Sequence, residues 1–106
     1  MADVQDDPWQ ELRWDLEALR AADRLTGERA AAAGVPASVA AFYPSLHLNL
    51  GEVYRKLGDL DLARHHCRRG SDAVDALPDD GYGRMITGAL SALSQRLGLG
   101  ELSNGA

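Results

Sequence analysis

Cysteine is almost absent from this sequence: among 106 residues only Cys67 occurs, which excludes an internal disulfide framework and suits a reducing compartment. The first residues, Met1–Asp7, are acidic, and no apolar segment follows a basic start, so we expect no signal peptide. The apolar runs are also too short to cross a bilayer. These absences together predict a cytoplasmic protein without a membrane partner.

Positive charge is also scarce, since 11 Lys and Arg residues stand against 16 Asp and Glu and give a formal net charge of −5. A domain of this charge lacks a general phosphate-binding surface, and we expect no nucleic-acid partner. Arg64, Arg68 and Arg69 gather on one segment. Asp61 and Asp72 stand at helical spacing to neutralise them, so an ion-paired face is favoured over contact with nucleic acid.

Lysine, aromatic and β-branched residues are few, whereas Ala and Leu dominate. This composition favours helices throughout. The strong preference for Arg over Lys suggests a bacterial protein from a high-GC genome. At 106 residues we expect one domain, residues 1–106, ordered from about residue 7 to residue 98, with a flexible N-terminus and C-terminal tail.

The stretch Leu48–Ala63 predicts the turn between two antiparallel helices. Gly58 stands where a helix takes its left-handed terminus, and Asp59 is placed to cap the next helix. Gly51 lies inside the first helix, where Gly costs about 1 kcal/mol relative to Ala, so it predicts close approach of the second helix opposite Ala63. The apolar residues that follow helical spacing before the turn are Leu50, Val53, Tyr54 and Leu57.

Residues 44–78 resemble one tetratricopeptide repeat (TPR). The resemblance implies an all-α fold, a short right-handed helical solenoid of about four antiparallel helices, and a role in binding proteins or peptides. His47 stands where the family often has Trp, and Cys67 where it often has an aromatic residue. The residues that carry the resemblance are Leu50, Gly51, Tyr54, Gly58, Ala63 and Gly70.

A first helix is predicted to begin at Pro8 with Asp7 as its N-cap, and to run to about Ala33, before Gly34 and Pro36. Gly27 lies within this helix and favours it only weakly, so a break of the helix at Gly27 is an alternative.

This first helix carries two apolar stripes on nearly opposite sides, at about 100° per residue. A helix packed on one neighbour needs only one stripe, so we expect the first in the core. The second is then covered by another part of the chain, a homodimer partner or a foreign protein. The first stripe is Trp9, Leu12, Leu16 and Leu19, and the second is Trp14, Ala18, Ala21 and Leu25.

Three further helices follow in the sequence. The second begins near Ser38, with either a kink at Phe42–Tyr43 or a true start at Pro44, and ends at Leu57. The third covers residues 60–77, and its inward positions are Leu60, Ala63, Cys67, Gly70, Val74 and Leu77. The fourth is capped by Asp79 or Asp80 and runs to about Leu97, with a core stripe of Tyr82, Ile86, Ala89 or Leu90, Leu93 and Leu97.

The run His65-His66-Cys67, with His47 elsewhere, raises the hypothesis of a metal site. Adjacent helical residues point about 100° apart, and no CxxC, HxxxH or HExxH spacing occurs, so we expect no metal and no cofactor. Cys67 is better interpreted as a small core residue. No nucleophile signature or phosphate-cradling glycine loop is present, so we expect no catalytic residue and no enzyme.

By resemblance to the family, the groove side of the helix that ends at Leu57 forms the candidate binding face. Asn49 matches an Asn that in some relatives grips a peptide backbone or terminal carboxylate, but the further basic residues of such a clamp are absent. A general protein or peptide contact is favoured, and ordinary solvated positions are the alternative. The face consists of Ser45, Leu48, Asn49, Glu52, Arg55 and Lys56.

Three classes of function are compatible with these residues. The leading one is a non-catalytic protein or peptide interaction module of TPR type. The second is a self-associating homodimeric structural protein, and the third is a small-molecule or metal-dependent sensor or enzyme.

Overall fold

The computed structural model describes residues 7–30 and 37–99, and every regular element in those residues is a helix. The prediction of an all-α fold is therefore confirmed. The predicted end of the first helix near Ala33, the N-terminal residues and the tail lie outside the described residues. The elements are α1 (Pro8–Ala30), α2 (Ala37–Ala40), α3 (Tyr43–Leu57), α4 (Leu60–Asp72), the 3₁₀ helix η2 (Val74–Ala76) and α5 (Gly81–Arg96).

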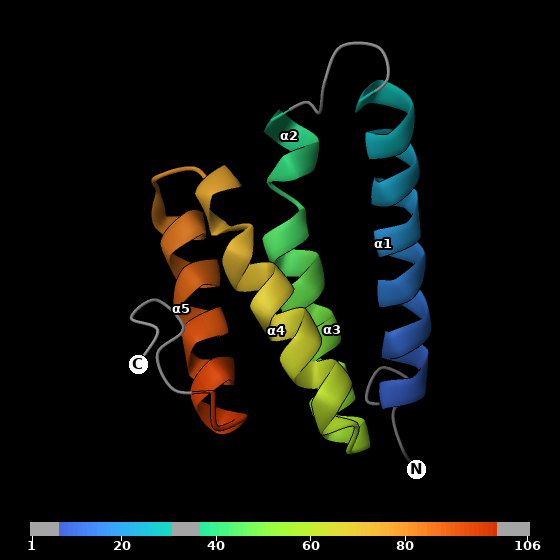
Figure 1. Ribbon diagram of the computed structural model, residues 1–106, viewed down its shortest axis with the longest axis vertical. Helices are drawn as coiled ribbons and strands as arrows, with labels where there is room; N and C mark the ends of the chain where they lie inside the picture. The colour runs from blue at the N-terminus through green and yellow to red at the C-terminus, as the bar shows by residue number, and fades with distance from the viewer. Residues whose placement is uncertain (1–6, 31–36, 100–106) are drawn as a thin grey trace.

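The four longer helices lie beside one another, with α1 and α5 at opposite edges and α3 and α4 between them (Figure 1). The central helix is α3, which packs against α1, α4 and α5. The single turn α2 precedes α3, and the helix is interrupted at residues 41–42. The interruption lies one residue before the kink predicted at Phe42–Tyr43, and α3 begins one residue before the alternative start at Pro44, which is buried in its first turn.

The predicted turn between α3 and α4 is confirmed in its details. Gly58 has φ 86°, and its N–H donates to the carbonyl oxygen of Arg55. The Asp59 carboxylate accepts from the N–H of Leu62 at 3.2 Å and so caps α4. A Cβ atom on Gly51 would stand only 3.3 Å from the carbonyl oxygen of Ala63. The two helices therefore approach closely where the small residues predicted it.

The core lies where α3, α4 and α5 meet. It is lined by Leu50, Val53, Ala63, Cys67, Ile86, Leu90, Leu93 and Leu97. The prediction for Leu60 was wrong, since its side chain is 43% exposed at the start of α4. The third helix is also shorter than predicted: α4 ends at Asp72 because the N–H of Ala73 bonds back to Gly70, and one 3₁₀ turn follows.

The start of α5 departs from the prediction at one position. Asp80 is the cap, and its carboxylate accepts from the N–H of Gly83 at 2.9 Å. Tyr82 was placed in the core but is 44% exposed. Gly83 takes the inward position, where a Cβ atom would stand 2.0 Å from the carbonyl oxygen of Pro78. Only Gly fits this contact, so the core stripe of α5 begins one residue later than predicted.

The first helix begins as predicted, with the Asp7 carboxylate accepting from the N–H of Trp9 at 3.0 Å, and it continues through Gly27 without a break. The prediction that Trp9 lies in the core was wrong, because its side chain is 68% exposed. Among residues 8–26 of α1, Ala22 is the buried residue, and it stands about 140° from Trp9 around the helix. The surface that meets α3 thus runs between the two apolar stripes.

Candidate functional site

The candidate binding face on α3 divides in the structure. Asn49 and Lys56 are exposed, whereas Ser45, Glu52 and Arg55 are half-buried. Leu48 leaves the face and packs against the core cluster around Cys67 and Leu93. The five polar residues that remain therefore form a narrow strip rather than one open surface.

Ion pairs tie this strip to the helices on either side. Lys56 Nζ lies 3.5 Å from Glu11 Oε2 of α1. On the other side, Glu52 accepts from Arg55 at 3.2 Å and from Arg96 of α5 at 3.1 Å. These pairs are partly exposed and contribute little stability each. These ion pairs determine which side chains of the strip remain available to bind a ligand.

The α1 side of the strip is acidic. Burial raises the pKa of the Asp15 carboxyl, the neighbouring Glu11 raises it further, and Lys56 lowers it. The charge of Lys56 is therefore shared between two acids of α1. A ligand carboxylate at this end would meet a lysine that is already neutralised, so the arrangement disfavours a carboxylate clamp.

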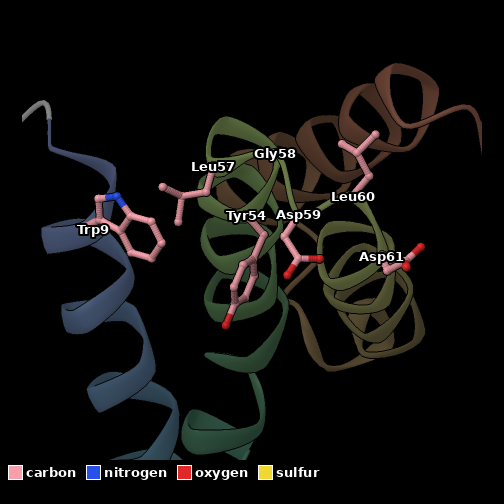
Figure 2. A pocket seen from close by; sticks show the side chains of 7 residues that line it. All are labelled: Trp9, Tyr54, Leu57, Gly58, Asp59, Leu60 and Asp61. Atoms are coloured by element: carbon pink, nitrogen blue, oxygen red, sulfur yellow. The ribbon is translucent and has the colours of Figure 1, made fainter.

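A second candidate site lies at the end of the domain where α1 meets the α3–α4 turn. An open hollow of about 570 Å³, here called the Trp9 hollow, is lined by Trp9, Tyr54, Leu57, Gly58, Asp59, Leu60 and Asp61. Figure 2 shows the Trp9 and Leu57 side chains facing each other from α1 and α3, with Tyr54 and Asp59 beside them. Apolar walls therefore adjoin two carboxylates. Sequence reasoning missed this hollow because it placed Trp9 in the core.

Two histidines form a buried pair between α3 and α4. The Nδ1 atoms of His47 and His66 are 3.0 Å apart, so one ring donates to the other. Their rings stack on each other and on Tyr43 and Tyr54. Burial, with smaller contributions from Arg69 and the neighbouring histidines, lowers the pKa of both histidines to about 4. Both rings are therefore neutral near pH 7.

The histidine pair was missing from the sequence interpretation, although a signal was available. Gly51 faces Ala63 across antiparallel helices, which places a residue four positions before Gly51 level with one four positions after Ala63. That register sets His47 beside His66 and Cys67. Only the contact between helices, and not spacing within one helix, brings the rings together.

The metal hypothesis finds no ligand set in the part of the chain that the structure describes, since no group of three or more His, Cys, Asp or Glu is placed to hold an ion. His65 is exposed and meets His66 edge to face. Cys67 is fully buried, as predicted for a core residue, and burial raises the pKa of its thiol.

The basic patch on α4 is used in part within the domain. Arg64 lies 3.7 Å from Asp61, the predicted neutralising partner. Its Nε also donates to the carbonyl oxygen of Leu97 at 3.1 Å, at the end of α5. A cation at a helix C-terminus is favourable, so Arg64 links α4 to α5.

The second stripe of α1 lies beside the surface that meets α3 and is exposed. Trp14 is 67% exposed and Leu25 is 44% exposed, and Ala18 and Ala21 between them are exposed too. No other part of the described chain covers it, so coverage by a second molecule stays a prediction.

Comparison with known proteins does not assign the site: no protein-family model, curated protein or solved structure matches this chain. Among residues 7–30 and 37–99, no helix is both long and apolar enough to cross a bilayer.

Proposed function

We propose that this chain is a non-catalytic module that binds another protein or a peptide, and that its helices form a TPR-like solenoid. The observation that carries the binding proposal is the Trp9 hollow. A Trp side chain that is 68% exposed stands against Leu57 there, at the mouth of a hollow large enough for one or two side chains. Exposed Trp beside an apolar recess is typical of protein interfaces.

The solenoid proposal rests on the way α4 meets its neighbours. Gly51 and Gly70 both lie where α3 and α4 approach closely: a Cβ atom on Gly70 would stand 3.2 Å from His47 Cβ and 3.3 Å from the Pro44 carbonyl oxygen. Small residues at both ends of the α3–α4 contact are the packing positions expected from the family resemblance. The order α1, then α3 and α4, then α5 suits a degenerate repeat followed by a clearer one.

Binding without catalysis agrees with the chemistry of the candidate groups. Cys67 is buried with a raised pKa, so its thiol is a poor nucleophile. His47 and His66 have pKa values of about 4, too low for an efficient general base near pH 7. The single buried thiol also fits the cytoplasmic setting that we propose for the module.

The lining of the Trp9 hollow indicates the ligand. The rings of Trp9 and Tyr54 and the side chain of Leu57 favour a large apolar side chain. Asp59, which caps α4, and Asp61 adjoin them, and the fully exposed Asp61 carboxylate lies 3.7 Å from Arg64, in a weak surface pair that a ligand cation can replace. A Lys or Arg next to the apolar residue would find both a carboxylate and an aromatic face. We therefore expect a peptide segment that pairs an apolar anchor with a basic residue.

A random peptide library displayed on phage tests this proposal, because such a selection needs no candidate partner. Enriched peptides should combine an aromatic or large aliphatic residue with a neighbouring Lys or Arg. Their affinity should fall by at least about tenfold in Trp9→Ala, the loss typical of a buried aromatic anchor. Met85→Ala is the matched control, since Met85 is similarly exposed but lies on α5. Selected peptides that bind Trp9→Ala as tightly as the wild type would refute the site.

A further inference from the structure

One exposed side of α1 is a second apolar surface, separate from the Trp9 hollow. The Trp14 stripe, which comprises Trp14, Ala18, Ala21 and Leu25, lies beside the surface that meets α3 and stays exposed. Trp14 and Leu25, its two large residues, are 67% and 44% exposed. Figure 1 shows α1 at the edge of the domain, so another helix can approach along much of its length.

The order of residues in the Trp14 stripe is complementary to itself when the helix is reversed. An antiparallel second α1 that sets Trp14 level with Leu25 also sets Ala18 level with Ala21, because both pairs of residue numbers have the same midpoint. Large residues then lie opposite each other at the two ends, and small residues in the middle allow the helices to approach. Such an isologous contact repeats each interaction twice about a two-fold axis.

The charged residues beside the stripe favour the same antiparallel arrangement. Glu17 and Arg24 are both exposed, and seven residues apart they share one flank of the stripe, since seven steps of about 100° return to nearly the same direction. A two-fold axis between antiparallel helices brings that flank against the same flank of the other copy. Glu17 then lies within about 3 Å, measured along the axis, of the level of Arg24 in the second copy.

The opposite flank of the stripe is already engaged within the domain. Glu11 bonds to Lys56 of α3, and Ala22 is buried. The approach of a second α1 therefore does not need to displace α3, and the acidic residues of this flank stay with their own Lys56.

We propose that a second copy of this chain covers the Trp14 stripe, in a two-fold homodimer formed by antiparallel pairing of the two α1 helices. Trp14 packs on Leu25 of the second copy, Ala18 meets Ala21, and Glu17 pairs with Arg24, each twice. The polar strips of the two α3 helices then lie on the same side of the dimer, because Lys56 adjoins α1 on the flank of Glu11. The Trp9 hollows face away from the contact, so the dimer leaves both available.

Charge exchange between Glu17 and Arg24 tests the pairing and its direction. Glu17→Arg alone and Arg24→Glu alone each place like charges opposite each other in a homodimer. Each should raise the dimer dissociation constant by about tenfold or more, measured by sedimentation or by light scattering across a concentration series. Mixing the two variants restores both opposite-charge pairs, so the mixture should form a heterodimer as tight as the wild-type homodimer.

Further variants separate the dimer contact from general effects on α1. Arg20→Glu makes the same charge change at an exposed site about 120° around the helix from Trp14 and 140° from Leu25, so it should leave dimerisation nearly unaltered. Trp14→Asp should give a monomer with the same circular dichroism spectrum as the wild type. A wild-type chain that stays monomeric at all concentrations would overturn the proposal. A dimer whose two charge variants fail to form a heterodimer would overturn the antiparallel arrangement.

Discussion

Replacing Gly51 by Ala measures how closely α3 and α4 pack. In the folded protein the new Cβ atom would stand 2.8 Å from Leu93 Cδ2, 3.3 Å from the Ala63 carbonyl oxygen and 3.6 Å from the Cys67 nitrogen. Leu93 is fully buried and has no solvent to move into, and the carbonyl oxygen belongs to the backbone of α4. The substitution must therefore push the helices or the Leu93 side chain away from their present positions.

Two opposing effects set the magnitude. Ala is better than Gly by about 1 kcal/mol in the interior of a helix. Overpacking of a close-packed core costs about 1–3 kcal/mol. We expect Gly51→Ala to lower the free energy of unfolding by up to about 2 kcal/mol in net terms, and Gly51→Leu to lower it further, since three more carbon atoms must fit the same contact.

Gly88→Ala is the matched control. Gly88 is also inside a helix, α5, but among the described residues no neighbouring atom would lie within 4 Å of its Cβ. This variant keeps the propensity gain without the overpacking, so it should stabilise the domain by about 1 kcal/mol. Thermal unfolding resolves the difference, because about 1 kcal/mol shifts the midpoint by several degrees in a domain of this size. Equal stabilisation by Gly51→Ala and Gly88→Ala would show that α3 and α4 do not touch as described.

The remaining predictions concern protonation and helix capping. Unfolded His47 and His66 bind protons below about pH 6.5 but folded ones only near pH 4, so the free energy of unfolding should fall as pH decreases through this window, by up to about 1.4 kcal/mol per pH unit for each. Urea unfolding at a series of pH values measures the slope, and a flat profile between pH 7 and 5 would contradict it. Asp80→Ala should cost about 1 kcal/mol through loss of the cap of α5, whereas Asp79→Ala, which removes only an exposed ion pair with Arg84, should leave the melting temperature nearly unchanged.

The turn between α3 and α4 and the start of α5 were predictable because their causes are local, whereas the end of α4 was predicted five residues too late. Gly58 and Asp59 determine where α3 ends and α4 begins within two residues of sequence. The same kind of local signal predicted that either Asp79 or Asp80 caps α5, and Asp80 is the cap. No distant contact is needed for either boundary, and the composition already favours helices throughout.

The orientation of α1 was less predictable, for a geometric reason. Periodicity reveals which residues share a direction but not the direction in which a neighbouring helix lies. The surface that meets α3 runs between the two stripes, so Trp9 falls outside it although Leu12 and Leu16 are half-buried. The prediction that Tyr82 lies in the core was wrong for a related reason. The tight contact between Gly83 and Pro78 turns Gly83, and not Tyr82, toward the core at the start of α5.

The candidate site depended most on long-range contacts. The bonds from Lys56 to Glu11 and from Glu52 to Arg96 join residues 45 and 44 positions apart. No spacing rule within a helix predicts such partners. The sequence could therefore nominate the polar strip of α3, but it could not show that ion pairs to both neighbours already occupy much of it.

The attachment of α1 has a consequence for the way its two surfaces act. This helix is held mainly through α3, with polar links from Glu11 to Lys56 and from Asp23 to Tyr43. Because the core is formed by α3, α4 and α5, we expect it to stay folded when α1 opens, and local opening should then cost less than global unfolding. Trp9 and Trp14 both belong to α1. A peptide bound at the Trp9 hollow and another copy of the chain bound at the Trp14 stripe would each favour the attached state of α1. Each would therefore strengthen the other's binding without any contact between them.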